Sequence, residues 1–504
     1  MRKRILDKCI PILLLLSVFF FFLIFFYKIH ALVLFDTDDW TYSYFQRNLA
    51  LEWGGWNPTR VLPEVLMPLV TLVSNFVFGL LIPDHFRAIS MGYAVTLSLL
   101  ITVMCWFLYR LLEKSNGKWL LLFYFLICHF WIYRILPHGN EYMFRAVNVT
   151  CVFFYVIPNL LNCILVLWIM QMQKSNGSIR EGFLQMSHSK RGAFVLFIVL
   201  AIYSNLWASI CLAVYVSVIA LFDGIHMLLK KNFSLMKYLK KHVIEICIVT
   251  LWAIQQIYEI NGGRAAGIDP GPYMQSLLTT LRAFHDLLRE LNTYFILSAI
   301  AIFLLAAVTI VIHKDKEAAR SLLILLTSVF IVGLYLILSC ARTGSGYLAR
   351  PEVHYCGFFF AMLILIISAD TIFRHFSIMS ALMPLFLAFA VCNCNTEGRT
   401  YLESNMGNYS PEACIRVCND IMQQFLDVDT AGKTEIIMEV PYFQSENNWP
   451  IANYAAGTFA SHFYKMGITE KLIHVMEFHC TTDKNIQLRI AENLVNTEST
   501  ENDH

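Results

Sequence analysis

The sequence predicts an α-helical polytopic membrane protein with about eleven transmembrane helices, followed by a small α/β segment at the C-terminus. Of the 504 residues, 57% are hydrophobic and only 15% are charged, and the mean hydropathy is +0.57. Soluble domains carry about 25% charged residues. In addition, apolar runs long enough to cross a bilayer recur along most of the chain, and polar residues gather in the connections between them.

The first apolar run is predicted to be an uncleaved membrane span. The basic residues Arg2, Lys3 and Arg4 precede apolar residues that extend from Cys9 to Tyr27. The run is too long for a secretory signal, and no small-x-small cleavage site follows it. Positive residues favour the cytoplasmic side, so the N-terminus is expected in the cytoplasm. The other basic residues come in short clusters between apolar runs, which indicates a topology signal and no nucleic-acid partner.

The positions of the basic residues decide whether two ambiguous apolar regions cross the membrane. Residues 61–82 are apolar but begin with Val61-Leu62-Pro63-Glu64, and residues 193–229 are interrupted at Ser204-Asn205. The basic loop residues fall in the cytoplasm only if 61–82 lies along the outer surface and 193–229 crosses twice. The other predicted spans are 7–27, 88–111, 118–136, 148–171, 243–260, 293–313, 320–340, 353–373 and 377–393.

This topology places every long polar segment on the outer side of the cytoplasmic membrane. We therefore expect a transmembrane domain, 1–393, with outer juxtamembrane helices within 28–87 and 261–292, and an extracytoplasmic domain, 394–504. The helix within 261–292 is amphipathic, which suits either a gate for access from the lipid or a purely structural role.

The C-terminal domain is expected to be a small α/β cap. Helical spacing predicts helices over 411–425 and 452–466, and short apolar runs predict strands over 435–441 and 472–478. The chain has 14 cysteines, none with zinc-ligand spacing backed by a second pair. Any disulfide in the cap is expected to join Cys394 to Cys480, or to involve Cys414.

Three carboxylates, Asp36, Asp38 and Asp39, directly follow the first span. A carboxylate at the bilayer centre costs about 3 kcal/mol even on the mildest scale, so this cluster must face water or a polar cavity. One interpretation is a catalytic corner, and the other is a solvated turn. The neighbouring Trp40 and Trp56 suit either a sugar-binding surface or an interfacial aromatic belt.

Two later outward loops add titratable and cationic residues. The loop 136–145 contains His138 and Glu141, which could approach the Asp cluster from the opposite wall; ordinary loop polarity is the alternative. Arginine can hold a phosphate with two parallel hydrogen bonds. The arginines that qualify are Arg60 after the Asp cluster and those of the loop 341–354, which contains Arg342, Tyr347, Arg350 and His354.

The layout resembles the GT-C class of integral-membrane glycosyltransferases, in particular bacterial O-antigen and cell-wall glucosyltransferases. The matching pieces are Asp36-Thr-Asp38-Asp39-Trp40, Trp56-Asn-Pro-Thr-Arg60, Tyr155-Val-Ile-Pro158 and Asn447-Asn-Trp-Pro-Ile451. The resemblance covers most of the chain in layout, and its motifs are short. It implies a polyprenyl-phosphate sugar donor, transfer on the outer membrane face, and a glycan or lipid-linked acceptor of the cell envelope.

The chemistry of glycosyl transfer assigns roles to these residues. A carboxylate must accept the proton of the acceptor hydroxyl, for which Asp38, Asp39 and Glu141 are the candidates. Cations must hold the departing phosphate, for which Arg60, Arg342, Arg350 and His354 are the candidates. Trp40, Trp56, His138 and Tyr347 are expected to contact substrate. The resemblance implies no particular cofactor, because similar enzymes with lipid-monophosphate donors are often metal-independent. Three clustered Asp side chains could still hold a divalent cation, so the use of a metal stays open.

Three other function classes remain open. A flippase or transporter of lipid-linked sugars would need ionisable residues near the middle of the membrane, where the spans carry few charges. An O-acyltransferase would need a buried histidine, for which His129 is the candidate. A non-enzymatic protein of envelope assembly is the third class.

Overall fold

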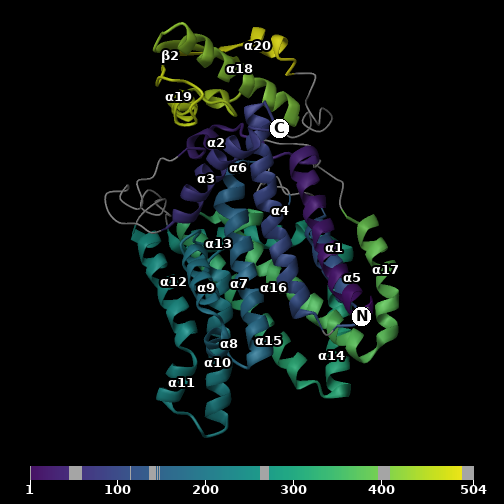
Figure 1. The fold of residues 1–504 in the computed structure, drawn as a ribbon. Helices are drawn as coiled ribbons and strands as arrows, with labels where there is room; N and C mark the ends of the chain where they lie inside the picture. Colours follow the sequence, from purple (N-terminus) through teal and green to yellow (C-terminus); the bar gives the residue numbers. More distant parts are fainter. Residues whose placement is uncertain are drawn as a thin grey trace.

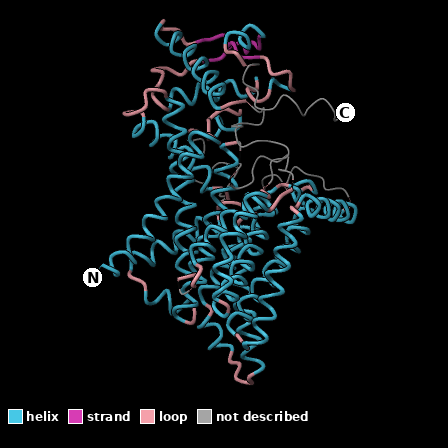
Figure 2. The backbone as a smooth tube through the Cα atoms, turned by 90° about the vertical axis from the view of Figure 1, so that its right-hand side faces the viewer, coloured by secondary structure: helices cyan, strands magenta, loops and turns pink. Residues whose placement is uncertain are grey.

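The computed structural model describes residues 2–44, 59–113, 115–134, 144, 146, 148–261, 272–394 and 409–490. Most of them form a bundle of helices, and residues 409–490, which we call the cap, pack on one end of it (Figures 1 and 2). The bundle helices are α1 (Arg2–Ile24), α2 (Thr37–Tyr42), α3 (Val61–Phe78), α4 (His85–Leu111), α5 (Lys118–Trp131), α6 (Val149–Cys151), α7 (Ile157–Asn176), α8 (Ile179–Gln185), α9 (His188–Ile202), α10 (Ile210–Leu229), α11 (Leu235–Lys241), α12 (Val243–Asn261), α13 (Tyr273–Glu290), α14 (Thr293–His313), α15 (Lys316–Thr343), α16 (Pro351–His375) and α17 (Ser377–Cys392).

Three short helical segments interrupt or extend these helices: the π-helices η1 (Phe25–Ile29) and η2 (Val152–Val156), and the 3₁₀ helix η4 (Ser345–Ala349). We call the end of the bundle that carries α2 and η4 the cap end. The opposite end, which carries α8 and α11, is the far end (Figure 1).

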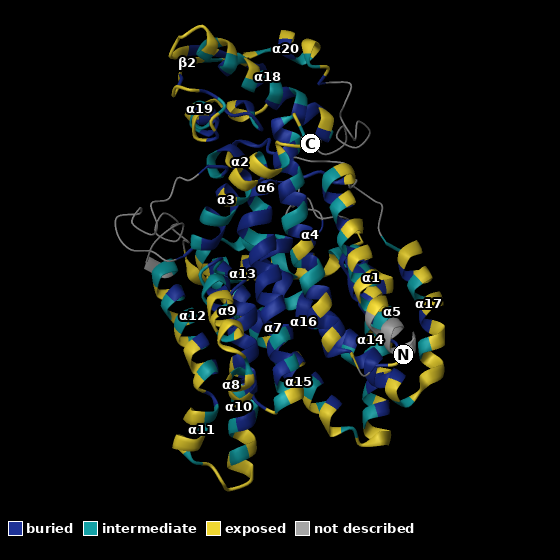
Figure 3. Cartoon of the chain, in the orientation of Figure 1, coloured by how far each residue is buried: buried dark blue, intermediate teal, exposed yellow. Residues whose placement is uncertain are grey.

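Helices α7 and α16 form the centre of the bundle. Both are buried over most of their length, whereas the helices around them expose one face (Figure 3). Helix α16 packs against α5, α7, α10, α14, α15 and α17, and α7 packs against α4, α8, α9 and α10. A helix that is apolar on all sides is stable only when other helices or lipid surround it.

The outer faces of the bundle carry large apolar side chains, such as Leu297, Leu304 and Val311 of α14 and Leu385 of α17. Soluble monomers do not expose apolar surface of this extent, so this surface indicates contact with lipid. Eight helices are long and apolar enough to cross a membrane, by length and composition among the described residues. The chain is therefore an α-helical, membrane-embedded protein.

Seven of these eight helices coincide with predicted spans, and the eighth is α3. Helix α3 covers the region that charge placement assigns to the outer surface. It packs closely along α4, where a Cβ added to Gly92 would lie 1.5 Å from Ser74 Oγ. The Thr71 hydroxyl lies 2.6 Å from the Tyr93 hydroxyl at the same contact. Helices α5, α9, α12 and α17, also predicted as spans, are not among these eight; α5 and α17 are apolar but shorter.

The region 193–229 forms two helices, as the interruption at Ser204-Asn205 predicts. Helix α9 ends at Ile202 and α10 begins at Ile210. The side-chain oxygen of Asn205 accepts hydrogen bonds from the backbone N–H groups of Trp207 (2.9 Å) and Ala208 (3.2 Å). A side-chain oxygen in this position caps the following helix.

The cap combines helices with a two-stranded parallel sheet. Its elements are α18 (Pro411–Thr430), β1 (Glu435–Pro441), η5 (Glu446–Asn448), η6 (Asn453–Ala455), α19 (Ala456–Lys465), β2 (His474–Thr481) and α20 (Thr482–Gln487). Both predicted helices and both predicted strands are present. Strand β1 alternates between buried and exposed residues, and its buried Ile436, Met438 and Val440 lie on the side that packs against α18.

The cap is joined to α2 by hydrogen bonds. The backbone N–H and the hydroxyl of Thr37 donate to Pro450 O at 2.9 and 2.7 Å, and the Ala452 N–H donates to the Thr37 hydroxyl at 2.8 Å. All 14 cysteines are free, including Cys394, Cys414 and Cys480, so the disulfides considered from the sequence are not formed in this structure.

Helix α13 is the amphipathic helix predicted within 261–292. It packs against α15 and η4 at the cap end, and several of its leucines, such as Leu278, Leu281 and Leu288, are exposed. An exposed apolar stripe on a helix with a polar opposite face is typical of a helix at a membrane interface.

Candidate active site

The Asp cluster lies at the start of α2, and its three carboxylates have different environments. Asp36 is the N-cap residue of α2 and is buried. One of its carboxylate oxygens accepts a hydrogen bond from the Asn148 side-chain amide at 3.0 Å. Asp36 therefore fixes the start of α2 against the segment that leads into α6.

Asp39 is a buried structural carboxylate. One oxygen accepts from the backbone N–H groups of Phe35 (3.3 Å) and Asp36 (3.2 Å). The other accepts from the backbone N–H (2.7 Å) and hydroxyl (2.9 Å) of Thr150. Burial raises the pKa of Asp39 to about 7, although the hydrogen bonds from Thr150 and Phe35 favour the charged form.

Asp38 is exposed, and it lines a cavity of about 340 Å³ at the cap end. Side chains of neighbouring residues on a helix point in different directions, so Asp38 faces this cavity while Asp39 faces the protein interior. We call this space the cap-end cavity. Its lining residues are Asp38, Tyr42, Arg60, Asn148, Thr150, Cys151, Phe154, Tyr155, Asn205, Leu206, Trp207, Glu259, Thr343, Tyr347, Arg350 and Trp449.

Two of the predicted arginines, Arg60 and Arg350, reach this cavity. Arg60 precedes α3 in a left-handed conformation (φ 61°). The Arg350 guanidinium forms an ion pair with the buried Glu352, and it lies 5.3 and 5.7 Å from the ring centres of Tyr155 and Tyr347. An arginine held between a carboxylate and two aromatic rings is pre-organised, which reduces the entropy cost of binding an anion.

His354 positions the segment that carries Arg350 and does not line the cavity. Its Nδ1 lies 3.0 Å from Leu348 O, and its Nε2 lies 2.5 Å from the Tyr133 hydroxyl. Because a carbonyl only accepts, Nδ1 carries the proton and donates to Leu348, and Nε2 accepts from Tyr133. Both ring nitrogens therefore have a partner within the protein. The sequence predicts that His354 contacts donor phosphate, whereas in the structure its imidazole supports η4.

Part of the cavity wall is formed by η2 and by the break between α9 and α10. In a π-helix the hydrogen-bonding pattern is shifted, which releases backbone carbonyls, and π-helical turns occur frequently at functional sites. The side-chain amide of Asn205 donates to the carbonyl of Phe154 in η2 at 2.9 Å. Trp207 follows Asn205 and packs against Tyr347, with ring centres 5.0 Å apart.

Two predicted residues lie elsewhere. Trp40 is fully buried between α2 and the cap, where it packs against Phe86, Phe459 and Phe463, and its indole N–H donates to Phe35 O at 3.0 Å. Trp40 is therefore a core residue and not a sugar-stacking surface. Arg342 is exposed on the last turn of α15, outside the lining of the cavity. Trp56, His138 and Glu141 lie outside the described residues.

Sequence reasoning did not assign several lining residues to the site. Glu259, near the end of α12, is a second carboxylate in the cavity. The signal was an acidic residue at the outer end of a predicted span. Trp449 comes from the cap, and only the tertiary fold brings it there. Asn205, interpreted from the sequence as a structural cap, serves as a cap and also lines the cavity.

The three Asp side chains do not converge on one point, because Asp36 and Asp39 are held by Asn148 and Thr150. Among the residues that the structure describes, no group of three or more His, Cys, Asp or Glu side chains is placed to hold a metal ion. The described carboxylates of this cluster therefore do not form a ligand set for a divalent cation.

No protein-family model, curated protein or solved structure matches this chain. The cap-end cavity combines carboxylates, arginines and aromatic rings beside apolar helices. Such a site can bind an anionic group beside a neutral, hydroxyl-rich one and accept a proton between them.

Proposed function

We propose that this protein is a membrane glycosyltransferase. It moves a sugar from a polyprenyl-phosphate donor to a glycan or lipid-linked acceptor of the cell envelope, on the outer face of the cytoplasmic membrane. The observation that carries the proposal is the meeting of Asp38, Arg60, Tyr347 and Arg350, from three distant parts of the chain, around one cavity at the cap end.

The proposed roles follow from the positions of these residues. Asp38 accepts the proton of the acceptor hydroxyl as its oxygen bonds to C1 of the sugar. The bond between C1 and the phosphate oxygen breaks, and the electron pair stays on the polyprenyl phosphate. Arg350 and Arg60 stabilise the charge of the departing phosphate. Tyr347 and Trp207 supply aromatic faces for the sugar ring.

The location suits a donor with a lipid tail. The cavity lies between α2, η2, η4 and the end of α12, beside helices whose outer faces contact lipid. The amphipathic helix α13 packs on η4, so a polyprenyl chain in the membrane and its phosphate at the surface are both within reach of this side. We further propose that the chain has about eleven spans, a cytoplasmic N-terminus and an extracytoplasmic cap.

Asp39 is not the proposed base. A pKa of about 7 would suit proton transfer, but both of its oxygens are occupied by donors and the residue is buried. A general base must reach the substrate proton before its pKa matters. Asp38 satisfies this requirement because its side chain is exposed to the cavity.

The test is transfer of radiolabelled sugar from a polyprenyl-phosphate donor to membrane acceptor by the reconstituted protein. Asp38→Asn is expected to lower kcat by about 100-fold or more, as loss of a general base does. Asp483→Asn is the matched control, because Asp483 is exposed in the cap and does not line the cavity. Normal turnover by Asp38→Asn would overturn the assignment.

A flippase of lipid-linked sugars is the second candidate, and a polar cavity at the far end of the bundle favours it. However, the part of α7 between the two cavities is mostly buried and apolar apart from two asparagines. The amide of Asn159 donates to the carbonyl of Glu352, and the amide of Asn162 donates to the carbonyls of Pro158 and Ala201. Movement of labelled sugar lipid across vesicles without transfer would support the flippase.

The surroundings of His129 argue against a role as the catalytic residue of an acyltransferase. The ring nitrogens of His129 lie 2.8 Å from Phe125 O and 2.7 Å from the Tyr355 hydroxyl, and the residue is buried. A histidine with both nitrogens used and no place in the cap-end cavity has the properties of a core residue.

A further inference from the structure

The far end of the bundle contains a second polar cavity, of about 470 Å³. The ends of α4, α7, α10, α12, α15 and α16 surround it, and we call it the far-end cavity. Its volume lies in the range of small-ligand sites. None of its lining residues takes part in the proposed glycosyl transfer, so this site requires an explanation of its own.

The lining of the far-end cavity is electrically balanced. Four Lys or Arg residues and four Asp or Glu residues line it, in addition to His242. A site for a simple anion or a simple cation would carry an excess of the opposite charge. A balanced lining fits a ligand that carries both charges.

Asp223 is already saturated. It pairs with Lys241 at 2.5 Å and with Arg320, and the Nε2 of His242 lies 3.4 Å from it. These contacts join α10, the end of α11 and α15. This part of the lining holds the helices together, and both oxygens of Asp223 already have a partner within the protein.

Two other carboxylates are not saturated. Glu245, 2% exposed, binds His242 Nδ1 through one oxygen at 2.9 Å, and its other oxygen has no partner among the described residues. Asp370, 7% exposed, pairs with Arg374 at 3.2 Å, and its Oδ1 has no partner in the described part of the chain. Buried acceptors of this kind are costly unless an N–H or O–H donor reaches them.

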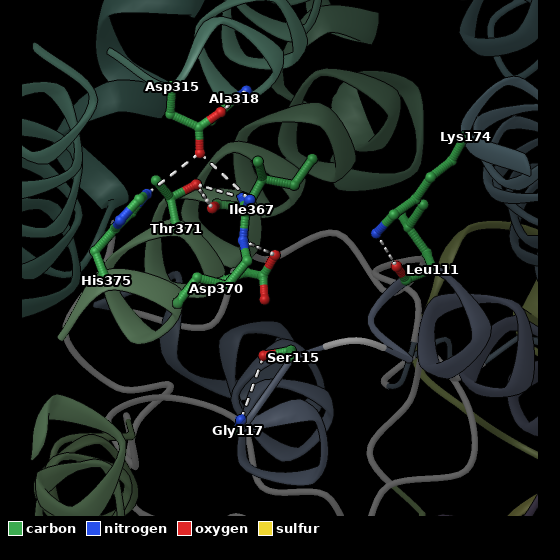
Figure 4. A network of polar contacts seen from close by, with 11 residues as sticks. Leu111, Ser115, Gly117, Lys174, Asp315, Ala318, Ile367, Asp370, Thr371 and His375 are labelled. Atoms are coloured by element: carbon green, nitrogen blue, oxygen red, sulfur yellow. Dashed lines mark hydrogen bonds and ion pairs between the residues drawn. The ribbon is translucent and has the colours of Figure 1, made fainter. Parts of the chain in front are cut away.

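Lys174 supplies the complementary group. Its ammonium donates to the Leu111 carbonyl at 2.9 Å, and it pairs with no carboxylate among the described residues (Figure 4). An ammonium has three donors, so two remain for a ligand. Figure 4 shows Lys174 and Asp370, both of which line this cavity, on separate segments of the chain.

We propose that the far-end cavity binds an aminoethyl phosphate group. The ammonium of the ligand donates to Glu245 and Asp370, and its phosphate accepts from Lys174. The group comes either from the head of a phosphatidylethanolamine lipid at this membrane surface or from soluble phosphoethanolamine. This proposal does not depend on the glycosyltransferase function.

Because the proposed ligand carries an ammonium with N–H donors, a lipid without such donors serves as the control ligand. Phosphatidylcholine has the same phosphate and the same net charge, but its quaternary nitrogen has no hydrogen to donate. The unpaired oxygens of Glu245 and Asp370 therefore discriminate between the two lipids. Phosphatidylglycerol offers hydroxyl donors but carries a net negative charge, which the balanced lining does not favour.

The test is a titration of the purified full-length protein in detergent with each lipid, followed by native mass spectrometry to obtain Kd. We expect saturable binding of phosphatidylethanolamine at least about tenfold tighter than that of phosphatidylcholine or phosphatidylglycerol, since a charge-assisted hydrogen bond is worth about this factor. A parallel titration with O-phosphoethanolamine distinguishes the sources: equal affinity identifies the soluble group, and weaker affinity identifies the lipid.

Glu245→Gln is expected to weaken phosphatidylethanolamine binding about tenfold. Glu113→Gln is the matched control, because Glu113 lies at the same end but pairs with Arg110 outside the cavity. If Glu245→Gln does not fold, Lys174→Gln replaces it, since its exposed side chain tolerates change. Equal affinity for phosphatidylethanolamine and phosphatidylcholine, or unchanged binding in both variants, would overturn the proposal.

Discussion

At the scale of single residues, two neighbouring aspartates have opposite roles. The sequence places Asp38 and Asp39 in one cluster and gives no means of separating them. The structure separates them through partners that lie far away in the chain: Thr150 occupies Asp39, and Asp38 faces the cap-end cavity. The same reason explains why His354 could not be recognised as a support of η4 before its contacts with Leu348 and Tyr133 were visible.

The two aspartates are expected to differ in their effect on stability. Asp39→Asn turns an NH₂ group toward donors that the carboxylate now accepts from, so it should lower the free energy of unfolding by about 1–3 kcal/mol. Asp38→Asn changes an exposed side chain and should stay within about 0.5 kcal/mol. Thermal unfolding in detergent measures both. Equal losses would show that the environments of the two residues are not as described.

The two arginines of the 341–354 loop are expected to differ in transfer activity. Arg350→Lys removes the planar guanidinium from between Tyr155 and Tyr347 and should lower kcat/KM for the donor about tenfold or more. Arg342→Lys changes an exposed side chain outside the cavity and should leave kcat/KM unchanged. A larger effect at Arg342 would mean that the phosphate binds outside the cap-end cavity.

At the scale of elements, local sequence signals predicted well where the element is determined locally. The interruption at Ser204-Asn205 predicted the break between α9 and α10, and the apolar run 435–441 predicted β1. The sequence predicted less where tertiary packing determines the element. Helix α5 ends at Trp131, earlier than its apolar run, and the chain departs from a regular α-helix at η2, in the wall of the cap-end cavity. The approach of α19 to α2 could not be predicted, because it joins two parts of the chain through buried side chains.

The contact between α19 and α2 contains a buried histidine. His462 Nδ1 lies 2.6 Å from the Ser43 hydroxyl, and His462 Nε2 lies 3.1 Å from His85 Nε2. Burial, with a contribution from His85, lowers the pKa of His462 well below its usual value of 6.5. His462 is therefore neutral in the folded protein but takes up a proton in the unfolded chain below pH about 6.5, so acid favours unfolding.

This linkage predicts a pH-dependent stability. The unfolding midpoint of the protein should fall as pH decreases below about 6.5, with a slope of up to about 1.4 kcal/mol per pH unit from this residue. His462→Asn keeps a polar group near Ser43 but cannot take up the proton, so its midpoint should depend less on pH. Thermal scans between pH 7.5 and 5.5 make the comparison, and parallel curves would contradict the role of His462.

At the scale of the whole molecule, composition alone predicted a helical membrane protein, and the exposed apolar surface of α14 and α17 agrees with it. The cap-end cavity could be anticipated in part, since Asp38, Arg60, Tyr347 and Arg350 were chosen from their loops. The presence of Glu259 and Trp449 in this cavity could not be predicted, because it depends on how α12 and the cap fold onto those loops.

The proposed orientation predicts that the two ends of the bundle face opposite sides of the membrane. Asp483→Cys, in a variant in which the exposed Cys392 and Cys480 are replaced by Ser, should react with an impermeant maleimide in intact cells. Glu113→Cys in the same background should react only after permeabilisation. Both residues are exposed and lie at opposite ends of the molecule, in α20 and after α4. Labelling of position 113 from outside would reverse the assigned topology.

The bond between Thr37 and Pro450 joins positions that are 413 residues apart. The ribosome therefore makes Asp38 long before it makes Trp449 and the loop that binds Thr37. The cap-end cavity is incomplete until the cap has been made and has packed onto α2. A chain that stops before the cap would still contain its apolar helices but would lack the part of the cavity wall that Trp449 supplies.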